Sequence, residues 1–129
     1  MKIIAYFLLL FLSAGFTSSN NKSENVRYIL IEAECKSGFD ALPGAKEKVI
    51  ITKVWKEEFD NAFEVVNAEP KLITDFEVAL EKSYPGQINQ IKDILVYMLN
   101  TEKEAKELYK RKLGLFKTLE KGVIELKVK

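Results

Sequence analysis

The feature that most constrains the fold is an uninterrupted apolar run, Ile-Leu-Val-Tyr-Met-Leu, at residues 94–99. The run is short enough for a strand, and strand residues point alternately to the two faces of a sheet. Because strands with one solvated face alternate apolar and polar residues, a run without alternation indicates a strand that is buried on both faces. We therefore expect residues 94–99 to form the central strand of a sheet.

Three other segments have the composition of strands. Residues 26–36 and 123–129 alternate apolar and polar side chains, which predicts one buried face and one wetter face. Residues 49–55 are rich in β-branched side chains, which favour strands. Residues 37–44 contain two glycines and a proline, which predicts a loop across which the strands at 26–36 and 49–55 pair antiparallel.

Two long helices are predicted by apolar stripes at helical spacing. The first starts near Pro70, which suits the first turn of a helix, and ends before Pro85. The second starts at Thr101, where Glu104 three residues later indicates a capping box, and ends at Gly122. The expected buried stripes are Leu72, Ile73, Phe76, Ala79 and Leu80 in the first helix, and Ala105, Leu108, Tyr109, Leu115, Phe116 and Leu119 in the second.

The elements combine into one α+β domain over residues 26–129. Residues 57–68 are ambiguous, because apolar residues at helical spacing favour a short helix while Asp60-Asn61 is also typical of a hairpin turn; we expect the helix. We predict a small, mainly antiparallel sheet of about four strands, with two main helices packed on one of its faces.

The N-terminus has the pattern of a secretory signal. Lys2 precedes an apolar run at residues 3–12, and small or polar residues follow at 13–19. This order predicts a cleavable signal peptide over residues 1–19, too short in its apolar part for a comfortable membrane anchor.

Export determines the expected location of the mature chain. Cleavage after Gly15 or after Ser19 leaves small residues at the recognition positions, and both sites stay open. The polar residues 20–25 then form a flexible lead-in. We expect an exported protein, in the periplasm, the cell envelope or the medium, with no stable membrane span after processing.

The charge of the processed chain argues against nucleic-acid binding. Without the signal peptide, 19 basic residues balance 19 acidic ones, whereas nucleic-acid binders need an excess of cations. Residues 20–100 carry 10 basic and 14 acidic groups, and residues 101–129 carry 9 and 5. The two parts complement each other across the fold or, as the alternative, form a dedicated anion-binding surface.

The residue types available exclude most catalytic chemistry. The chain has no histidine, and its one cysteine, Cys35, lies on the apolar face of a predicted strand, where we expect an inert core thiol. No glycine-rich phosphate loop or nucleophile motif is present. We therefore assign no catalytic, cofactor-binding or metal-binding residue and expect no cofactor.

Carboxylates are the remaining candidates for acid-base work. Glu32 and Glu34 are expected on one strand face, roughly 7 Å apart, where they form either an ordinary solvated pair or a hydrolytic or calcium site. Glu57, Glu58 and Asp60 form a second acidic cluster, which we interpret as charge at the N-terminus of a helix.

Aromatic and basic residues are the candidates for binding. Four aromatic residues are either core or core-edge residues or candidates for stacking on sugars or peptides, with Phe39 in its loop expected to be the most exposed. A basic series on the last helix is expected to be a solvated face, or a contact with anionic polymers or lipid headgroups. The aromatic candidates are Trp55, Tyr28, Phe39 and Tyr84, and the basic series is Lys103, Lys106, Lys110, Arg111, Lys117 and Lys121.

These observations favour a non-catalytic binding module that recognises a protein or a cell-envelope polymer. The strand, helix and strand expected over residues 94–128, with a helix start of Thr-Glu-Lys-Glu-Ala and a glycine stop, resemble the second half of small peptidoglycan-binding repeat domains. The resemblance covers less than a third of the chain, the N-terminal half does not match, and it implies cell-wall glycan binding as an alternative. Further alternatives are a hydrolase that uses Glu32 and Glu34, and an inhibitor or immunity-type partner of a larger exported protein.

Overall fold

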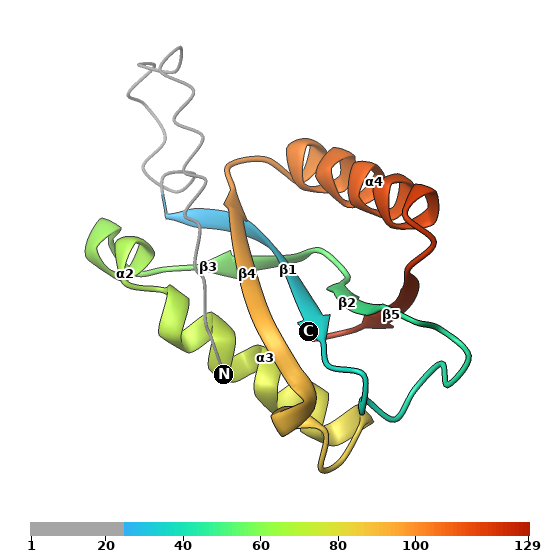
Figure 1. Cartoon of the computed structure of the whole chain (residues 1–129). Helices are drawn as coiled ribbons and strands as arrows, with labels where there is room; N and C mark the ends of the chain where they lie inside the picture. The colour runs from blue at the N-terminus through green and yellow to red at the C-terminus, as the bar shows by residue number, and fades with distance from the viewer. Residues whose placement is uncertain (1–24) are drawn as a thin grey trace.

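The structure, a computed structural model, describes residues 25–129 and shows an α+β architecture (Figure 1). The predicted signal peptide over residues 1–19 and the lead-in up to residue 24 lie outside the described residues. Within the described range no helix is long and apolar enough to cross a membrane.

The order of elements follows the predicted one closely. The ambiguous segment forms a short helix, α2, as expected, and the side chain of Asn61 caps it by accepting a hydrogen bond from the Glu64 amide at 2.9 Å. The elements are β1 (Val26–Cys35), β2 (Lys48–Thr52), β3 (Trp55–Glu58), α2 (Ala62–Val66), α3 (Glu69–Ser83), a 3-10 turn η1 (Ile88–Gln90), β4 (Ile91–Leu99), α4 (Glu102–Thr118) and β5 (Gly122–Leu126).

The centre of the sheet is β1, and the prediction of a central strand at 94–99 is wrong. One edge of β1 pairs with β4, while its other edge pairs with β3 and then β2, all antiparallel. Among the described strands β4 pairs with β1 alone. The last strand, β5, pairs with β2 in parallel, so the sheet is mixed although most of its pairings are antiparallel, as predicted.

A β-bulge divides the predicted second strand. Glu32 pairs with Ile51 and Ile29 with Trp55, so that the three residues 52–54 lie opposite two residues of β1. At the bulge the side chain of the buried Thr52 takes the place of a backbone acceptor for Ile31. Its hydroxyl oxygen accepts a hydrogen bond from the Ile31 amide at 2.8 Å. The strand therefore continues, bent, as β3.

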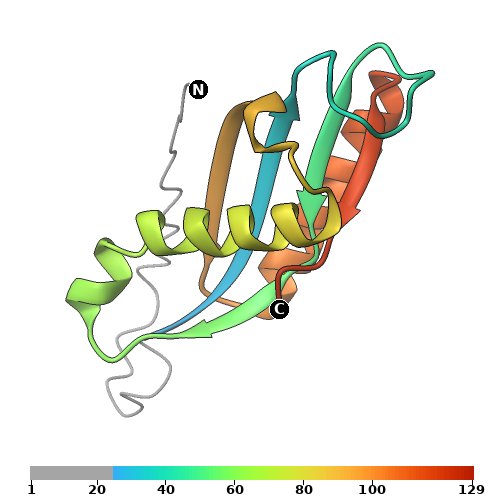
Figure 2. The ribbon, with the colours of Figure 1, turned by 90° about the horizontal axis from the view of Figure 1, so that it is seen from below.

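The two long helices cover opposite faces of the sheet, which corrects the prediction of one covered face (Figure 2). Side chains of α3 pack with Ile31 and the even-numbered residues of the 94–99 run, whereas α4 packs with Leu30 and Tyr97. The run 94–99 is apolar on both faces because each face lies under a helix. The lack of alternation indicated that both faces of the strand are covered. Two helices can cover the faces, so the strand does not also need a neighbouring strand at each edge.

Helix α4 is continuous, and its buried stripe differs from the predicted one at two leucines. Thr101 caps the helix as expected, accepting a hydrogen bond from the Glu104 amide at 3.1 Å. Phe116 is buried, but Leu115 is 47% exposed and Leu119 is 53% exposed. Neighbouring residues of a helix differ by about 100° in direction, so Leu115 points away from the seam that Phe116 occupies. Leu119 follows the last helical residue, Thr118, so the predicted end at Gly122 is wrong, and Gly122 begins β5 instead.

Candidate functional site

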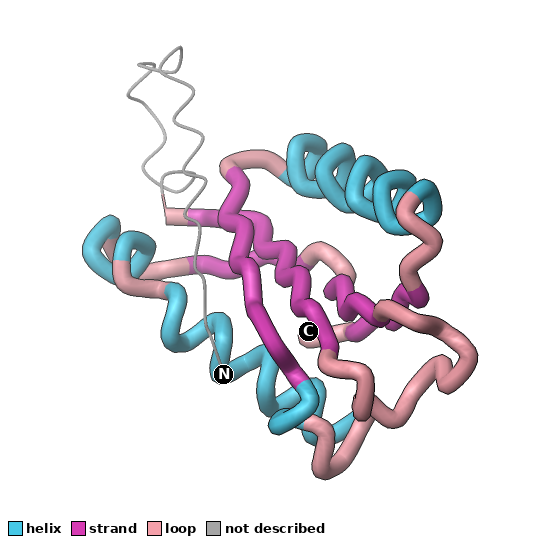
Figure 3. The backbone as a smooth tube through the Cα atoms, viewed as in Figure 1, coloured by secondary structure: helices cyan, strands magenta, loops and turns pink. Residues whose placement is uncertain are grey.

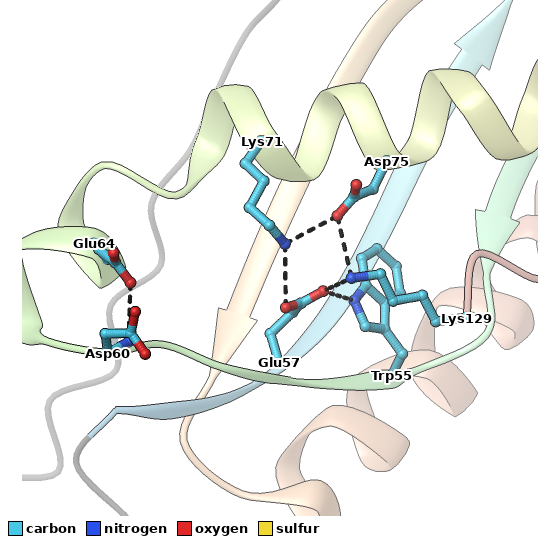
Figure 4. Close-up of polar contacts among 7 residues, drawn as sticks. All are labelled: Trp55, Glu57, Asp60, Glu64, Lys71, Asp75 and Lys129. Carbon is cyan, nitrogen blue, oxygen red and sulfur yellow. Dashed lines mark hydrogen bonds and ion pairs between the residues drawn. The ribbon is translucent and has the colours of Figure 1, made fainter.

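A buried carboxylate, Glu57, lies at the centre of the most connected polar cluster in the described chain. The alternation of β3 directs Trp55 and Glu57 to the same face of the sheet, towards α3, and leaves Glu57 only 7% exposed. The indole nitrogen of Trp55 donates a hydrogen bond to Glu57 at 3.0 Å, and the ammonium of Lys71 donates one at 3.3 Å. Lys129 donates a further hydrogen bond to the same carboxylate (Figure 4).

Asp75 completes this cluster from α3. Lys71 and Asp75 are one helical turn apart, and Figure 4 shows both pointing towards Glu57 and Lys129. The Asp75 carboxylate lies 3.2 Å from the Lys71 ammonium and 3.4 Å from that of Lys129. Two carboxylates and two ammonium groups therefore tie β3, α3 and the chain after β5 together without net charge.

The protonation state of Glu57 is fixed by these contacts. Burial disfavours the charged carboxylate, but the hydrogen bonds from Lys129, Trp55 and Lys71 outweigh it and lower the pKa of Glu57. The bond to Glu57 likewise raises the pKa of Lys129. Both groups stay charged near neutral pH, as expected of a structural ion-pair cluster rather than of a proton donor or acceptor. We call this cluster of Glu57, Lys71, Asp75 and Lys129 the clamp.

A groove with a volume of about 490 Å³ borders the clamp. Neither Lys82 nor Lys127 forms an ion pair with another described residue, whereas the ammonium of Lys129 is held by the clamp. Two unpaired lysines, Lys82 and Lys127, thus line this hollow, whereas Asp75 and Lys129 already have partners in the cluster. The walls are Asp75, Val78, Ala79, Lys82 and Ser83 from α3, and residues 127–129 after β5.

The dipole of α3 accounts for the position of only one of these lysines, Lys82. Lys82 lies in the last turn of α3, where the C-terminal carbonyl groups favour a cation. Lys127 and Lys129 come from the segment after β5, so the dipole of α3 does not account for their positions. The surplus of positive charge in the groove is therefore a property of two independent segments.

Glu32 and Glu34 are held apart by different lysines. They share the same face of β1, as predicted, but Lys112 of α4 lies 3.1 Å from Glu32, and Lys92 of β4 lies 3.7 Å from Glu34. The Lys112 ammonium also lies 5.1 Å from the centre of the Tyr97 ring. The two carboxylates are thus separate ion-pair partners that connect β1 to α4 and to β4.

The interpretation of the acidic cluster as helix N-terminal charge is wrong for Glu57 and Glu58, whereas Asp60 directly precedes Asn61, the N-cap of α2. Glu57 and Glu58 belong to β3, because this strand continues past the bulge. The acidic residue in the first turn of α2 is Glu64, whose carboxylate accepts a hydrogen bond from the Asp60 amide at 2.9 Å (Figure 4). Across residues 25–129 no group of three or more acidic or cysteine side chains is arranged to hold a metal ion.

Cys35 and Phe39 are both buried on the α3 side. The predicted core position of Cys35 is confirmed, and burial raises the pKa of its thiol to about 12. Phe39, expected to be exposed, is 1% exposed and packs on Tyr84 with 5.5 Å between the ring centres. The long loop after β1 folds back (Figure 3), and the buried Lys48 donates a hydrogen bond to the Phe39 carbonyl at 2.5 Å.

The uneven charge distribution along the chain is partly neutralised across the fold. Lys112 pairs with Glu32, Lys121 lies 3.7 Å from Glu47, and Lys129 pairs with Glu57. Each pair joins the basic C-terminal part to the acidic remainder. The first alternative, complementation across the fold, is therefore present in part, while Lys127 stays unpaired among the described residues and lines the groove.

The structure separates the two strands that carried the resemblance to peptidoglycan-binding repeats. β4 pairs with β1, and β5 pairs with β2, so the two strands are not neighbours in the sheet. No protein-family model matches the chain, and comparison with curated proteins and with solved structures gives no match.

Proposed function

We propose that this protein is an exported, non-catalytic binding module whose groove between α3 and residues 127–129 holds an anionic ligand. The observation that supports this proposal is the surplus of lysines over carboxylates around the hollow. Unpaired ammonium groups beside a concave surface are the usual means by which a protein holds a phosphate or carboxylate group.

The clamp supports the proposal by fixing one wall of the groove. Glu57 and Asp75 hold and neutralise the ammonium of Lys129, so the wall is fixed and the charge offered to a ligand comes from Lys82 and Lys127. Val78 is 65% exposed and, with Val128, adds an apolar surface beside the cations. A small organic anion with an apolar body fits this combination better than a bare inorganic ion.

A non-catalytic function is favoured because the buried charged groups already have partners within the protein. The buried Glu57 is engaged by two lysines and a tryptophan, and the sequence contains no histidine to act as a base. Export is supported by the N-terminal sequence pattern. The intact mass of the native protein tests it: a chain that starts after Gly15 or Ser19 agrees with export, and a full-length cytosolic chain contradicts it.

Trp55 provides a direct test of the groove. It is the only tryptophan of the chain and contacts Glu57, so its fluorescence reports on the clamp. We expect hexyl phosphate to bind and uncharged hexanol to bind far more weakly. The double variant Lys82→Gln, Lys127→Gln is expected to weaken binding of hexyl phosphate about tenfold or more, because two charge-assisted contacts are lost.

A matched control removes the same amount of charge elsewhere. The double variant Lys103→Gln, Lys110→Gln changes two exposed lysines of α4 and is expected to keep the affinity of the unmodified protein. Equal losses in both double variants, or equal binding of hexanol and hexyl phosphate, contradict the proposed site.

A further inference from the structure

A second groove lies beside the β-bulge, between the bulge and α4. It consists of two adjoining hollows of about 410 Å³ and 270 Å³, which share Val54 and Lys106. The larger hollow is lined by Lys53, Val54, Lys106, Tyr109 and Glu125. The smaller is lined by Tyr28, Val54, Trp55, Lys56, Glu102 and Lys106.

The charges in this second groove are largely neutralised by their neighbours. Lys106 lies 2.6 Å from Glu102 on α4, and the Tyr109 hydroxyl donates a hydrogen bond to Glu125 at 2.5 Å. Lys56 lies 3.2 Å from Glu58. An ion therefore gains little here, whereas the paired groups still offer hydrogen-bond donors and acceptors to an uncharged polar ligand.

Two half-buried tyrosines give each hollow an aromatic wall. Tyr28 comes from β1 and Tyr109 from α4, so the rings are set on rigid elements rather than on loops. A tyrosine presents an apolar ring together with a hydroxyl group. A pyranose ring has the matching properties, since its C–H groups form an apolar face and its hydroxyl groups form a polar edge.

We infer that the groove between the β-bulge and α4 is a binding site for an uncharged oligosaccharide, distinct from the anion groove beside α3. Two adjoining hollows, each with one tyrosine and with Lys106 between them, suit successive sugar units of one chain. The bulge contributes to the site, because Val54 belongs to the bulged residues 52–54 and lines both hollows.

Titration with soluble oligosaccharides tests the inference. Chitotetraose and maltotetraose are added to isotopically labelled protein, and amide chemical shifts are followed. We expect at least one of them to bind at millimolar concentration or better and to move signals around residues 53–56 and 102–109. Tyr109→Leu, which removes the ring, is expected to weaken binding roughly tenfold.

Two controls separate binding from folding. Lys106→Met changes a largely exposed side chain shared by both hollows, so it is expected to weaken binding without lowering stability. Tyr84→Leu, on the α3 side, is expected to leave binding unchanged, as is the Lys82→Gln, Lys127→Gln variant. The inference is overturned if neither sugar binds, or if binding is the same in Tyr109→Leu and Lys106→Met as in the unmodified protein.

Discussion

The two faces of the sheet are built differently. The face under α3 holds a cluster of 20 buried residues, whereas the cluster under α4 contains five among the residues described. Helix α4 instead reaches the sheet through polar groups at its rim, such as Lys112 with Glu32 and Tyr109 with Glu125. The comparison indicates that α3 provides most of the apolar stabilisation, while α4 is held by a mixture of a small core and polar contacts.

The two faces also differ in how deeply their charged side chains are buried and in which partners these have. The α3 side buries the carboxylate of Glu57 and surrounds it with lysines, which leaves an excess of cations beside it. The α4 side keeps most of its charges near the surface and pairs them locally, apart from the partly buried pair of Lys112 with Glu32. A buried carboxylate must be compensated, and this requirement assembles lysines from separate segments at one place.

The largest expected effect separates the two hydrophobic clusters. Phe76→Ala, in the cluster under α3, is expected to lower the free energy of unfolding by about 3 to 5 kcal/mol, and Phe116→Ala, under α4, by about 3 kcal/mol. Leu119→Ala is expected to change it by less than about 0.5 kcal/mol, since this side chain is 53% exposed. Urea unfolding measures all three. A cost for Phe116→Ala above that for Phe76→Ala would reverse the comparison.

A smaller effect is expected from the clamp, and it depends on which partner is removed. The double variant Lys71→Met, Lys129→Met leaves the Glu57 carboxylate buried with Trp55 as its remaining donor, at a cost of about 2 to 4 kcal/mol. Glu57→Gln keeps an acceptor for Trp55 and frees two half-exposed lysines, at about 1 to 2 kcal/mol. Thermal unfolding compares them, and an equal cost would show that Glu57 is not buried as described.

The smallest expected effect is a pH dependence that arises from Glu57 and Lys129 on the α3 side. The pKa of Glu57 is lowered on folding, so its stabilisation is complete above the unfolded value near 4.5 and is lost as the pH falls through the folded value. The pKa of Lys129 is raised, so its contribution is complete below 10.5 and is lost as the pH rises through the folded value.

Unfolding midpoints measured from pH 7 to pH 2 test the acid part of this dependence. Glu57→Gln is expected to remove part of the loss of stability on acidification. Glu58→Gln, which changes the exposed neighbouring carboxylate, is expected to preserve it. The same acid dependence in all three proteins would rule out a contribution from Glu57.

Local patterns predicted most of the elements correctly. Thr101 caps the start of α4, and the predicted strands and helices are present, because N-caps, alternation and helical stripes act within a few residues. The errors concern residues whose environment comes from elsewhere in the chain. Leu119 repeats at helical spacing with Phe116 but lies beyond the end of α4, and Phe39 is in a polar loop that folds onto the core.

The candidate sites were predicted only in part. Trp55 and Tyr28 were chosen as aromatics, and Tyr28 does line a groove, but the clamp partners of Glu57 were not expected. Lys71 and Lys129 are 58 residues apart in the sequence. Nothing in the local pattern around either lysine indicates a buried carboxylate that lies on a third element.

The sequence by itself determined the α+β class, the order of the elements, the N-terminal cap at Thr101 and the core position of Cys35, since each depends on short-range periodicity and composition. The tertiary structure alone decided the central position of β1, the parallel pairing of β5 with β2 and the placement of α3 and α4 on opposite faces. These features depend on which segments meet, and periodicity reports only that a face is buried. The same holds for both grooves, because each is formed where a helix lies beside a segment distant from it in the sequence.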